Sequence, residues 1–179
     1  MKPPNVPTRR SIRLRGHDYS APAVYFVTIC THHKECFLST IRDGALTLSP
    51  FGKIVIREWR RTARLRPNVV LLETDIVVMP NHVHFILVIL EKVPAAGTSA
   101  ALVRRVRPGS LGAIVRAFKA ATAREINLLR STPGAPVWQR NYYEKILRDE
   151  QAVAEVRSYI LTNPAEWEDD PEHPGNAGR

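Results

Sequence analysis

The chain has 179 residues and a mass of 20.2 kDa, the size of one domain, and it is too short for a (β/α)8 barrel of about 250 residues. Its 26 lysines and arginines outnumber 17 acidic residues, and the net charge of +9 predicts a polyanionic partner. No apolar run reaches the ~18 residues of a membrane span, and no signal-peptide pattern follows the basic N-terminus. Two cysteines make no disulfide framework, so we expect a cytoplasmic protein without a membrane partner.

Charge is distributed unevenly along the chain. Residues 1–16 carry five basic side chains and no acidic one, whereas residues 165–179 carry five acidic side chains and one arginine. This pattern predicts a basic N-terminal arm over 1–20, a folded domain over 21–167 and a disordered acidic tail over 168–179.

The N-terminal half predicts a strand, a short strand, a helix and then two further strands. Pro50 suits the first turn of a helix, and Pro80-Asn81 suits a tight turn between two buried strands. In chain order we expect a strand over 23–31, a short strand over 45–48, a helix over 50–65, and strands over 69–79 and 82–90.

The C-terminal half predicts a basic loop over 93–109 and then a helix, a strand and a last helix. Ser110 and Asp149 are expected N-caps for helices over 111–129 and 150–162, and a strand, irregular in part, is expected over 137–147. The order β-α-β-β-α-β predicts an α+β, ferredoxin-like antiparallel sheet with helices on one face, followed by an extra C-terminal helix.

Two histidines with one residue between them stand out in the second predicted hairpin. His82 and His84 alternate with Val83 and Phe85, so on a strand both imidazoles point to one face, with Cβ atoms about 7 Å apart. Two imidazoles at this spacing can bind one metal ion, although two unconnected histidines would give the same pattern. The adjacent pair His32-His33 would face opposite ways and is a poorer candidate.

The last predicted helix carries a tyrosine and an asparagine on one face. Tyr159 and Asn163 are four residues apart, one above the other. The simpler interpretation is a tyrosine that packs on the sheet and an asparagine that closes the helix before Pro164.

Taken together, these motifs resemble those of the HUH single-tyrosine nucleases, and more closely the REP-associated tyrosine transposases. The resemblance covers about residues 18–167. It is carried by Met79-Pro-Asn-His-Val-His-Phe85, by Trp138-Gln-Arg-Asn-Tyr-Tyr-Glu-Lys-Ile-Leu-Arg148, by Tyr159 through Pro164, and by the opening strand Tyr25-Phe-Val-Thr-Ile-Cys-Thr31.

The resemblance implies a role for each motif residue. His82 and His84 match the metal-binding histidines, Asn163 matches the residue that completes the metal site through its amide oxygen, and Tyr159 matches the nucleophile. The family's metal is Mg²⁺ or Mn²⁺, although the donor types alone would equally admit Mn²⁺ or Zn²⁺. The implied reaction is nicking and strand transfer of DNA through a 5′-phosphotyrosine that frees a 3′-OH.

The resemblance also implies the partner: single-stranded DNA that carries a hairpin, such as a REP-like repeat. It favours a monomer, leaves a homodimer open, and places the protein with the nucleoid. Tyr142 and Tyr143 are rival nucleophiles without a helical polar residue at i+4, and Tyr25 is expected to pack in or near the sheet. Candidate DNA contacts are Arg9, Arg10, Arg13, Arg15, Arg104, Arg105, Arg107, Arg116, Lys119 and Arg124.

Two other function classes remain open. A non-catalytic single-stranded nucleic-acid-binding module could use the same fold, although the RNP signature of an RRM is missing from the sequence. A metal-dependent hydrolase of small molecules is the third alternative, and it would form no covalent adduct with DNA.

Overall fold

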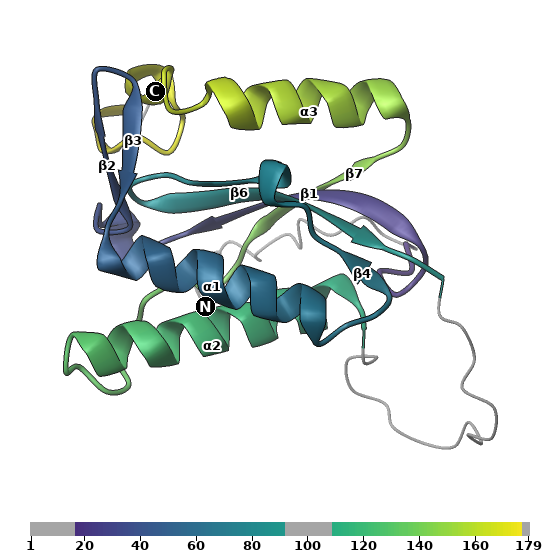
Figure 1. Cartoon of the computed structure of the whole chain (residues 1–179), viewed down its shortest axis with the longest axis horizontal. Coiled ribbons are helices and arrows are strands. Elements are labelled where there is room, and N and C mark those ends of the chain that lie inside the picture. The colour runs from purple at the N-terminus through teal and green to yellow at the C-terminus, as the bar shows by residue number, and fades with distance from the viewer. Residues whose placement is uncertain (1–16, 92–108, 177–179) are drawn as a thin grey trace, which may run out of the picture.

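The structure, a computed structural model, describes residues 17–91 and 109–176. Most of the predicted basic arm and basic loop therefore lies outside the described residues (Figure 1). The same holds for seven of the candidate DNA contacts, namely Arg9, Arg10, Arg13, Arg15, Arg104, Arg105 and Arg107.

An antiparallel sheet forms the centre of the molecule. Its strands are β1 (Ala23–Cys30), β4 (Val69–Val70), β5 (Ile76–Val78), β6 (His82–Ile89) and β7 (Tyr143–Leu147). β6 and β1 lie in the middle, β4 and β5 both pair with β6, and β7 pairs with the other edge of β1. This is the strand order of a ferredoxin-like sheet, so the predicted fold class is confirmed.

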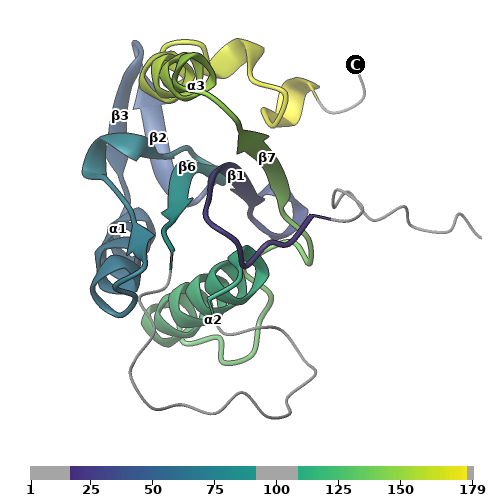
Figure 2. The same cartoon turned by 90° about the vertical axis from the view of Figure 1, so that its right-hand side faces the viewer.

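Helices cover both faces of the sheet. α1 (Pro50–Arg64) and α2 (Leu111–Leu129) lie on one face, and α3 (Glu150–Thr162) lies on the other (Figures 1 and 2). The sequence sets each helix start, because the side chains of Ser49, Ser110 and Asp149 accept hydrogen bonds from backbone N–H groups of the first turn. No helix among the described residues is both long and apolar enough to cross a membrane.

The two faces have separate apolar cores. Under α1 and α2, the rings of Trp59, Phe85 and Phe118 contact one another within the larger core. Under α3, a smaller cluster joins the sheet to the helix through Phe26, Ile86, Leu147, Val156 and Ile160. Because strand residues alternate between faces, Val83 and Phe85 lie in the larger core and their neighbours His82 and His84 face α3, as predicted.

Two predicted strands differ from the structure, and one strand of the structure was not predicted. The strand expected over 69–79 is interrupted by the 3-10 turn η2 (Glu73–Asp75), and the strand expected over 137–147 is regular only from Tyr143. A hairpin of β2 (Ser39–Arg42) and β3 (Ala45–Leu48) was predicted only in its second strand. Its turn, Asp43-Gly44, has positive φ at both residues, as a two-residue hairpin turn requires, and the dipeptide Asp-Gly is the sequence signature of such a turn.

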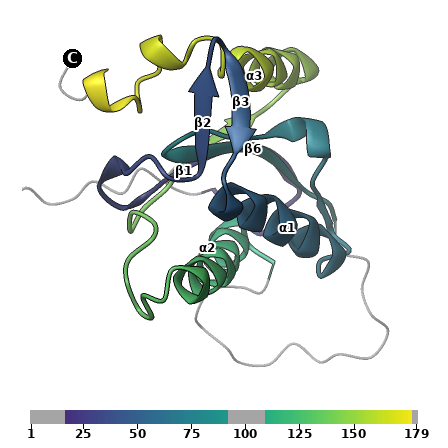
Figure 3. The same ribbon diagram turned by 60° about the vertical axis from the view of Figure 1, so that its left-hand side comes forward.

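The acidic tail is ordered through residue 176, unlike the disorder expected from residue 168. After α3 the chain forms the 3-10 turns η3 (Trp167–Asp169) and η4 (Pro174–Asn176), drawn in yellow beyond the end of α3 in Figure 3. The order has a physical cause, because Trp167 is buried and the carboxylate of Asp170 accepts hydrogen bonds from a side-chain amide and a backbone N–H. The tail therefore brings an acidic side chain into the interior.

Candidate active site

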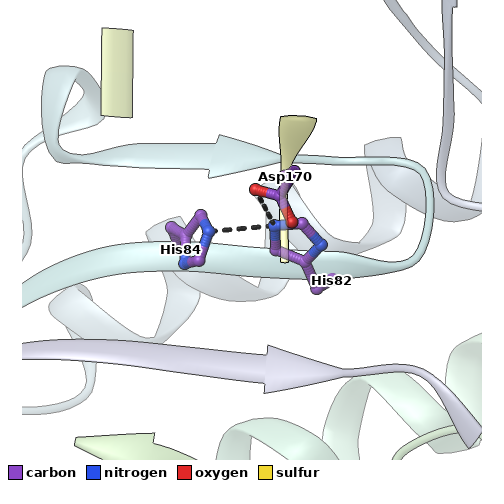
Figure 4. Close-up of side chains that lie close together, drawn as sticks. All are labelled: His82, His84 and Asp170. Atoms are coloured by element: carbon purple, nitrogen blue, oxygen red, sulfur yellow. Dashed lines mark hydrogen bonds and ion pairs between the residues drawn. The ribbon is translucent and has the colours of Figure 1, made fainter. Parts of the chain in front are cut away.

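The two histidines meet at the start of β6, on the face covered by α3. Their Nε2 atoms are 2.9 Å apart, and both side chains are almost completely buried (Figure 4). The turn at Pro80-Asn81 ends with a hydrogen bond from Met79 N–H to the carbonyl of His82, which fixes where the strand begins. The predicted convergence of the two imidazoles is therefore present in the structure.

Asn81 orients the ring of His82. The amide nitrogen of Asn81 donates to the carbonyls of Lys34 (3.3 Å) and Glu172 (2.7 Å), which leaves its Oδ1 as the acceptor 2.8 Å from Nδ1 of His82. The proton of His82 is therefore on Nδ1, and the lone pair on Nε2 points into the site. This arrangement is typical of metal-binding histidines, whose other nitrogen donates to a fixed acceptor.

Thr28, on the neighbouring strand β1, orients the ring of His84. Thr28 lies directly opposite His84 in the β1–β6 register, and its Oγ1 is 2.8 Å from Nδ1 of His84. The hydroxyl can accept a hydrogen bond from Nδ1–H, which leaves Nε2 free to act as a ligand. Strand pairing thus places a partner behind His84, and the turn before β6 places one behind His82.

Both histidines are neutral near neutral pH. Burial lowers the pKa of His82 to about 3, and burial together with the neighbouring His82 lowers the pKa of His84 to about 3. Neutral imidazole is the form that binds a metal ion, so little protonation competes with a cation at physiological pH.

Asp170 supplies a carboxylate at the same place, and the side chain of Asn163 contacts that carboxylate. His82, His84 and Asp170 form a buried group whose ligand atoms lie within 4.8 Å of one another (Figure 4). The amide nitrogen of Asn163 donates to Oδ2 of Asp170 at 2.8 Å, and its Oδ1 is buried without a hydrogen-bond partner. A buried, unpartnered amide oxygen is costly unless something binds it, so this set of nitrogen and oxygen donors fits a divalent cation.

Tyr159 brings a hydroxyl to this group from α3. Its Oη lies 3.2 Å from Nε2 of His84 and donates toward Oδ2 of Asp170 at 3.4 Å. Burial, followed by the charge of Asp170, raises the pKa of Tyr159 well above its usual value of 10. The phenol is therefore protonated in this environment and needs added positive charge to ionise.

The rival tyrosines Tyr142 and Tyr143 lie beside the site, in the wall of a cavity that His84 and Tyr159 also line. Tyr25 is completely buried and hydrogen-bonds His17, and Tyr142 packs against the larger core. Tyr143 is half-exposed on β7.

Lys119, a predicted DNA contact, is bonded within the protein, and its contact with DNA stays a prediction. Its ammonium group donates to the backbone carbonyls of Gln139, Arg140 and Asn141, and burial lowers its pKa to about 8. Arg116 and Arg124 are exposed on α2, which lies across the sheet from Tyr159, and their contact with DNA stays a prediction (Figure 1). Lys119 ties the segment before β7 to α2.

Two residues of the site were not identified from the sequence. Thr28 carries a weak signal, since it lies on the strand expected to pair beside the histidines. Asp170 carries none, because it sits in an acidic run that composition alone assigns to a tail.

The fold matches that of a solved transposase. The structure of a REP-associated tyrosine transposase bound to a REP hairpin superposes with a TM-score of 0.58 at 17% identity, over 87% of this chain and 74% of that one. The chain therefore has the fold of the tyrosine transposases that the sequence motifs resemble.

Sequence comparison adds a nearer relative. An uncharacterized protein of Haemophilus influenzae is 36% identical over 168 residues, which are 90% of this chain and 91% of the relative. The chain belongs to the same family as this Haemophilus protein. No protein-family model matches it.

Proposed function

We propose that this protein is a metal-dependent endonuclease and strand transferase, a transposase, that nicks single-stranded DNA near hairpin-bearing repeats. The observation that carries the proposal is the meeting of the Tyr159 hydroxyl with two neutral histidines and the carboxylate of Asp170, which the side chain of Asn163 contacts. An activatable phenol, a cation site and a net charge of +9 are what phosphodiester cleavage through a tyrosine requires.

Each residue of the site has a proposed role. His82, His84 and the oxygens of Asp170 and Asn163 would hold the cation, which the resemblance identifies as Mg²⁺ or Mn²⁺. When bound, this cation supplies positive charge and Lewis acidity at the scissile phosphate.

The proposed reaction breaks one bond and forms one. Oη of Tyr159 attacks the phosphorus in line, the P–O3′ bond breaks, and a 5′-phosphotyrosine forms. The phenolic proton passes to a water molecule, because the Asp170 carboxylate is a proposed ligand of the cation, and the leaving 3′ oxygen takes a proton from water. The covalent bond keeps the phosphate reactive, so a 3′-OH can later reverse the step and join strands.

The proposed partner follows from the neighbour of known structure, which is bound to a REP hairpin. We therefore propose single-stranded DNA with a REP-like hairpin as the substrate, and a monomer as the active species. The basic arm over residues 1–16 is a candidate contact with the hairpin.

Covalent trapping tests the proposal. The full chain is incubated with a labelled single-stranded hairpin oligonucleotide and Mn²⁺ or Mg²⁺, and the products are separated on a denaturing gel. A slowly migrating adduct should form in the wild type and in Tyr143→Phe, and should be lost in Tyr159→Phe and His82→Ala. An adduct that persists in Tyr159→Phe would refute the assignment of the nucleophile.

The same assay, together with a native gel, distinguishes the proposed enzyme from a non-catalytic binding module. A non-catalytic nucleic-acid-binding module would retain the hairpin in a native gel and form no adduct with any metal ion.

A further inference from the structure

A cavity of about 650 Å³ opens beside the candidate active site. Its walls come from β1, β6, β7, α3 and the segments before β7 and after α3. Tyr159 and His84 face it, and so do the aromatic rings of Phe26, Tyr142 and Tyr143. A cavity of this size with aromatic walls can admit part of a nucleic-acid strand next to the tyrosine.

The charge of this cavity is unusual for a site that would admit a phosphate. Asp170 and Glu172 contribute two carboxylates to its wall, and among the described residues that line it Lys34 is the one lysine or arginine. A DNA phosphate entering here would be repelled by the carboxylates unless a cation met it. Lys34 is the protein's own candidate for that cation.

Lys34 is held in place by a constrained turn. His33 and Lys34 both adopt left-handed backbone conformations, with φ of 54° and 57°, which side chains other than glycine adopt at an energetic cost. The turn is closed by Thr31, whose hydroxyl donates to the carbonyl of Glu35 at 2.9 Å. The surrounding structure thus maintains a conformation that an ordinary loop would relax.

The same turn is bonded to the metal site. The amide nitrogen of Asn81 donates to the carbonyl of Lys34, while Oδ1 of Asn81 accepts from the ring of His82. One side chain therefore sets both the orientation of an imidazole and the position of the lysine. The ammonium of Lys34 is 3.0 Å from a carboxylate oxygen of Glu172, and both side chains are 30% exposed. A partly exposed ion pair of this kind contributes little stability and can exchange its anion.

We infer that Lys34 is a substrate-binding residue whose ammonium exchanges Glu172 for a non-bridging oxygen of the scissile phosphate or of the phosphate next to it. The inference rests on the proposed function, because that function identifies the anion that enters the cavity as a DNA phosphate. No covalent bond changes in this step: one ion pair is replaced by another, and the strand is drawn toward Tyr159. A lysine suits this task as a compact charge with three donors.

The test compares three variants of the full chain in the adduct assay. Lys34→Met should lower the rate of adduct formation at limiting DNA by about tenfold or more, the usual effect of a lost charge-assisted hydrogen bond. Lys34→Arg should stay within a few-fold of the wild type. Lys53→Met, which removes the same charge from an exposed position on α1, should leave the rate unchanged.

Substrates that carry one uncharged methylphosphonate identify the phosphate. The difference between wild type and Lys34→Met should vanish when the methylphosphonate is at the scissile position or one position away. The inference is overturned if Lys34→Met reacts like the wild type, or if its defect is the same on every substrate, which is the result expected when Lys34 serves only to pair with Glu172.

Chemical footprinting provides a second measurement that needs no variant. Hairpin DNA should protect Lys34, but not Lys53, from an amine-acetylating reagent, as read by mass spectrometry. Equal acetylation of Lys34 with and without DNA would overturn the inference. Wild-type protein that forms no adduct would refute the proposed function instead, and the footprint would still decide the role of Lys34.

Discussion

Replacing Thr28 by valine removes one hydroxyl and keeps the shape of the side chain. Thr28 is 6% exposed, and its Oγ1 is the partner 2.8 Å from Nδ1 of His84. In the variant a methyl group faces Nδ1 and offers no hydrogen-bond acceptor, and the side chain of His84 is 3% exposed. The imidazole then loses the contact that favours a proton on Nδ1 and a lone pair on Nε2.

The expected effect is on metal affinity. Loss of an outer partner of a metal-binding histidine typically weakens binding by about 10–100-fold, or about 1.4–2.7 kcal/mol. Burial of the site places the expectation toward the upper end of that range. The free energy of unfolding of the metal-free protein should fall by only about 1 kcal/mol, the usual contribution of one hydrogen bond.

Calorimetric titration of the full chain with Mn²⁺ measures this effect directly, and the Mn²⁺ concentration that half-saturates adduct formation should shift by the same factor. Thr28→Ser restores the hydroxyl and should restore the affinity. Thr40→Val, at an exposed position of β2, is the matched control. Unchanged Mn²⁺ affinity in Thr28→Val, or an equal loss in Thr28→Ser, would refute the reasoning.

Three further predictions concern stability. Arg157→Met removes the guanidinium that bonds both oxygens of buried Asp75 and joins α3 to the sheet, so the free energy of unfolding in urea should fall by about 1–3 kcal/mol. Gly52→Ala places a Cβ against the carbonyl oxygen of Leu38, so it should cost about 1–3 kcal/mol even though alanine favours helices. Burial lowers the pKa of both site histidines to about 3 in the folded protein, whereas in the unfolded chain a histidine has its ordinary pKa of ~6.5. Between these two values the unfolded chain binds more protons than the folded protein, so the metal-free protein should lose stability as the pH falls from 6.5 toward 3.

Each stability prediction has an outcome that contradicts it. An Arg157→Met variant with wild-type stability would mean that the pair with Asp75 does not secure α3. Gly52→Ala should be compared with Lys53→Ala on the same helix, and equal stabilities would show that the backbone accommodates the methyl group. The pH effect should flatten when both histidines are replaced by asparagine, and an unchanged slope would assign it to other groups.

The sheet and its helices were predictable because their patterns are local. Alternating apolar residues predict β1 and β6, and capping side chains predict the start of each helix. The facing of His82 and His84 followed from strand alternation alone. Breaks in regular structure were not predictable, because η2 depends on Asp75, whose partner Arg157 lies 82 residues away.

The residues of the site were predictable only where two of them lie on the same helix or strand at a characteristic spacing. Tyr159 and Asn163 share a helix, and His82 and His84 share a strand. Asp170 and Thr28 reach the same place through the packing of distant segments, and no spacing in the sequence expresses that contact. Lys119 shows the opposite difficulty, because a basic residue on a helix suggests a free charge until its three carbonyl partners are known.

The order of synthesis has a bearing on when this site can act. The two histidines leave the ribosome with the first half of the chain, and the sheet that holds them also needs β7 at residues 143–147. Tyr159, Asn163 and Asp170 are made last, on the one helix and the turn that cover the other face. Because the hydroxyl and the carboxylate arrive only after the scaffold is nearly complete, a nascent chain would not yet have the proposed active site assembled.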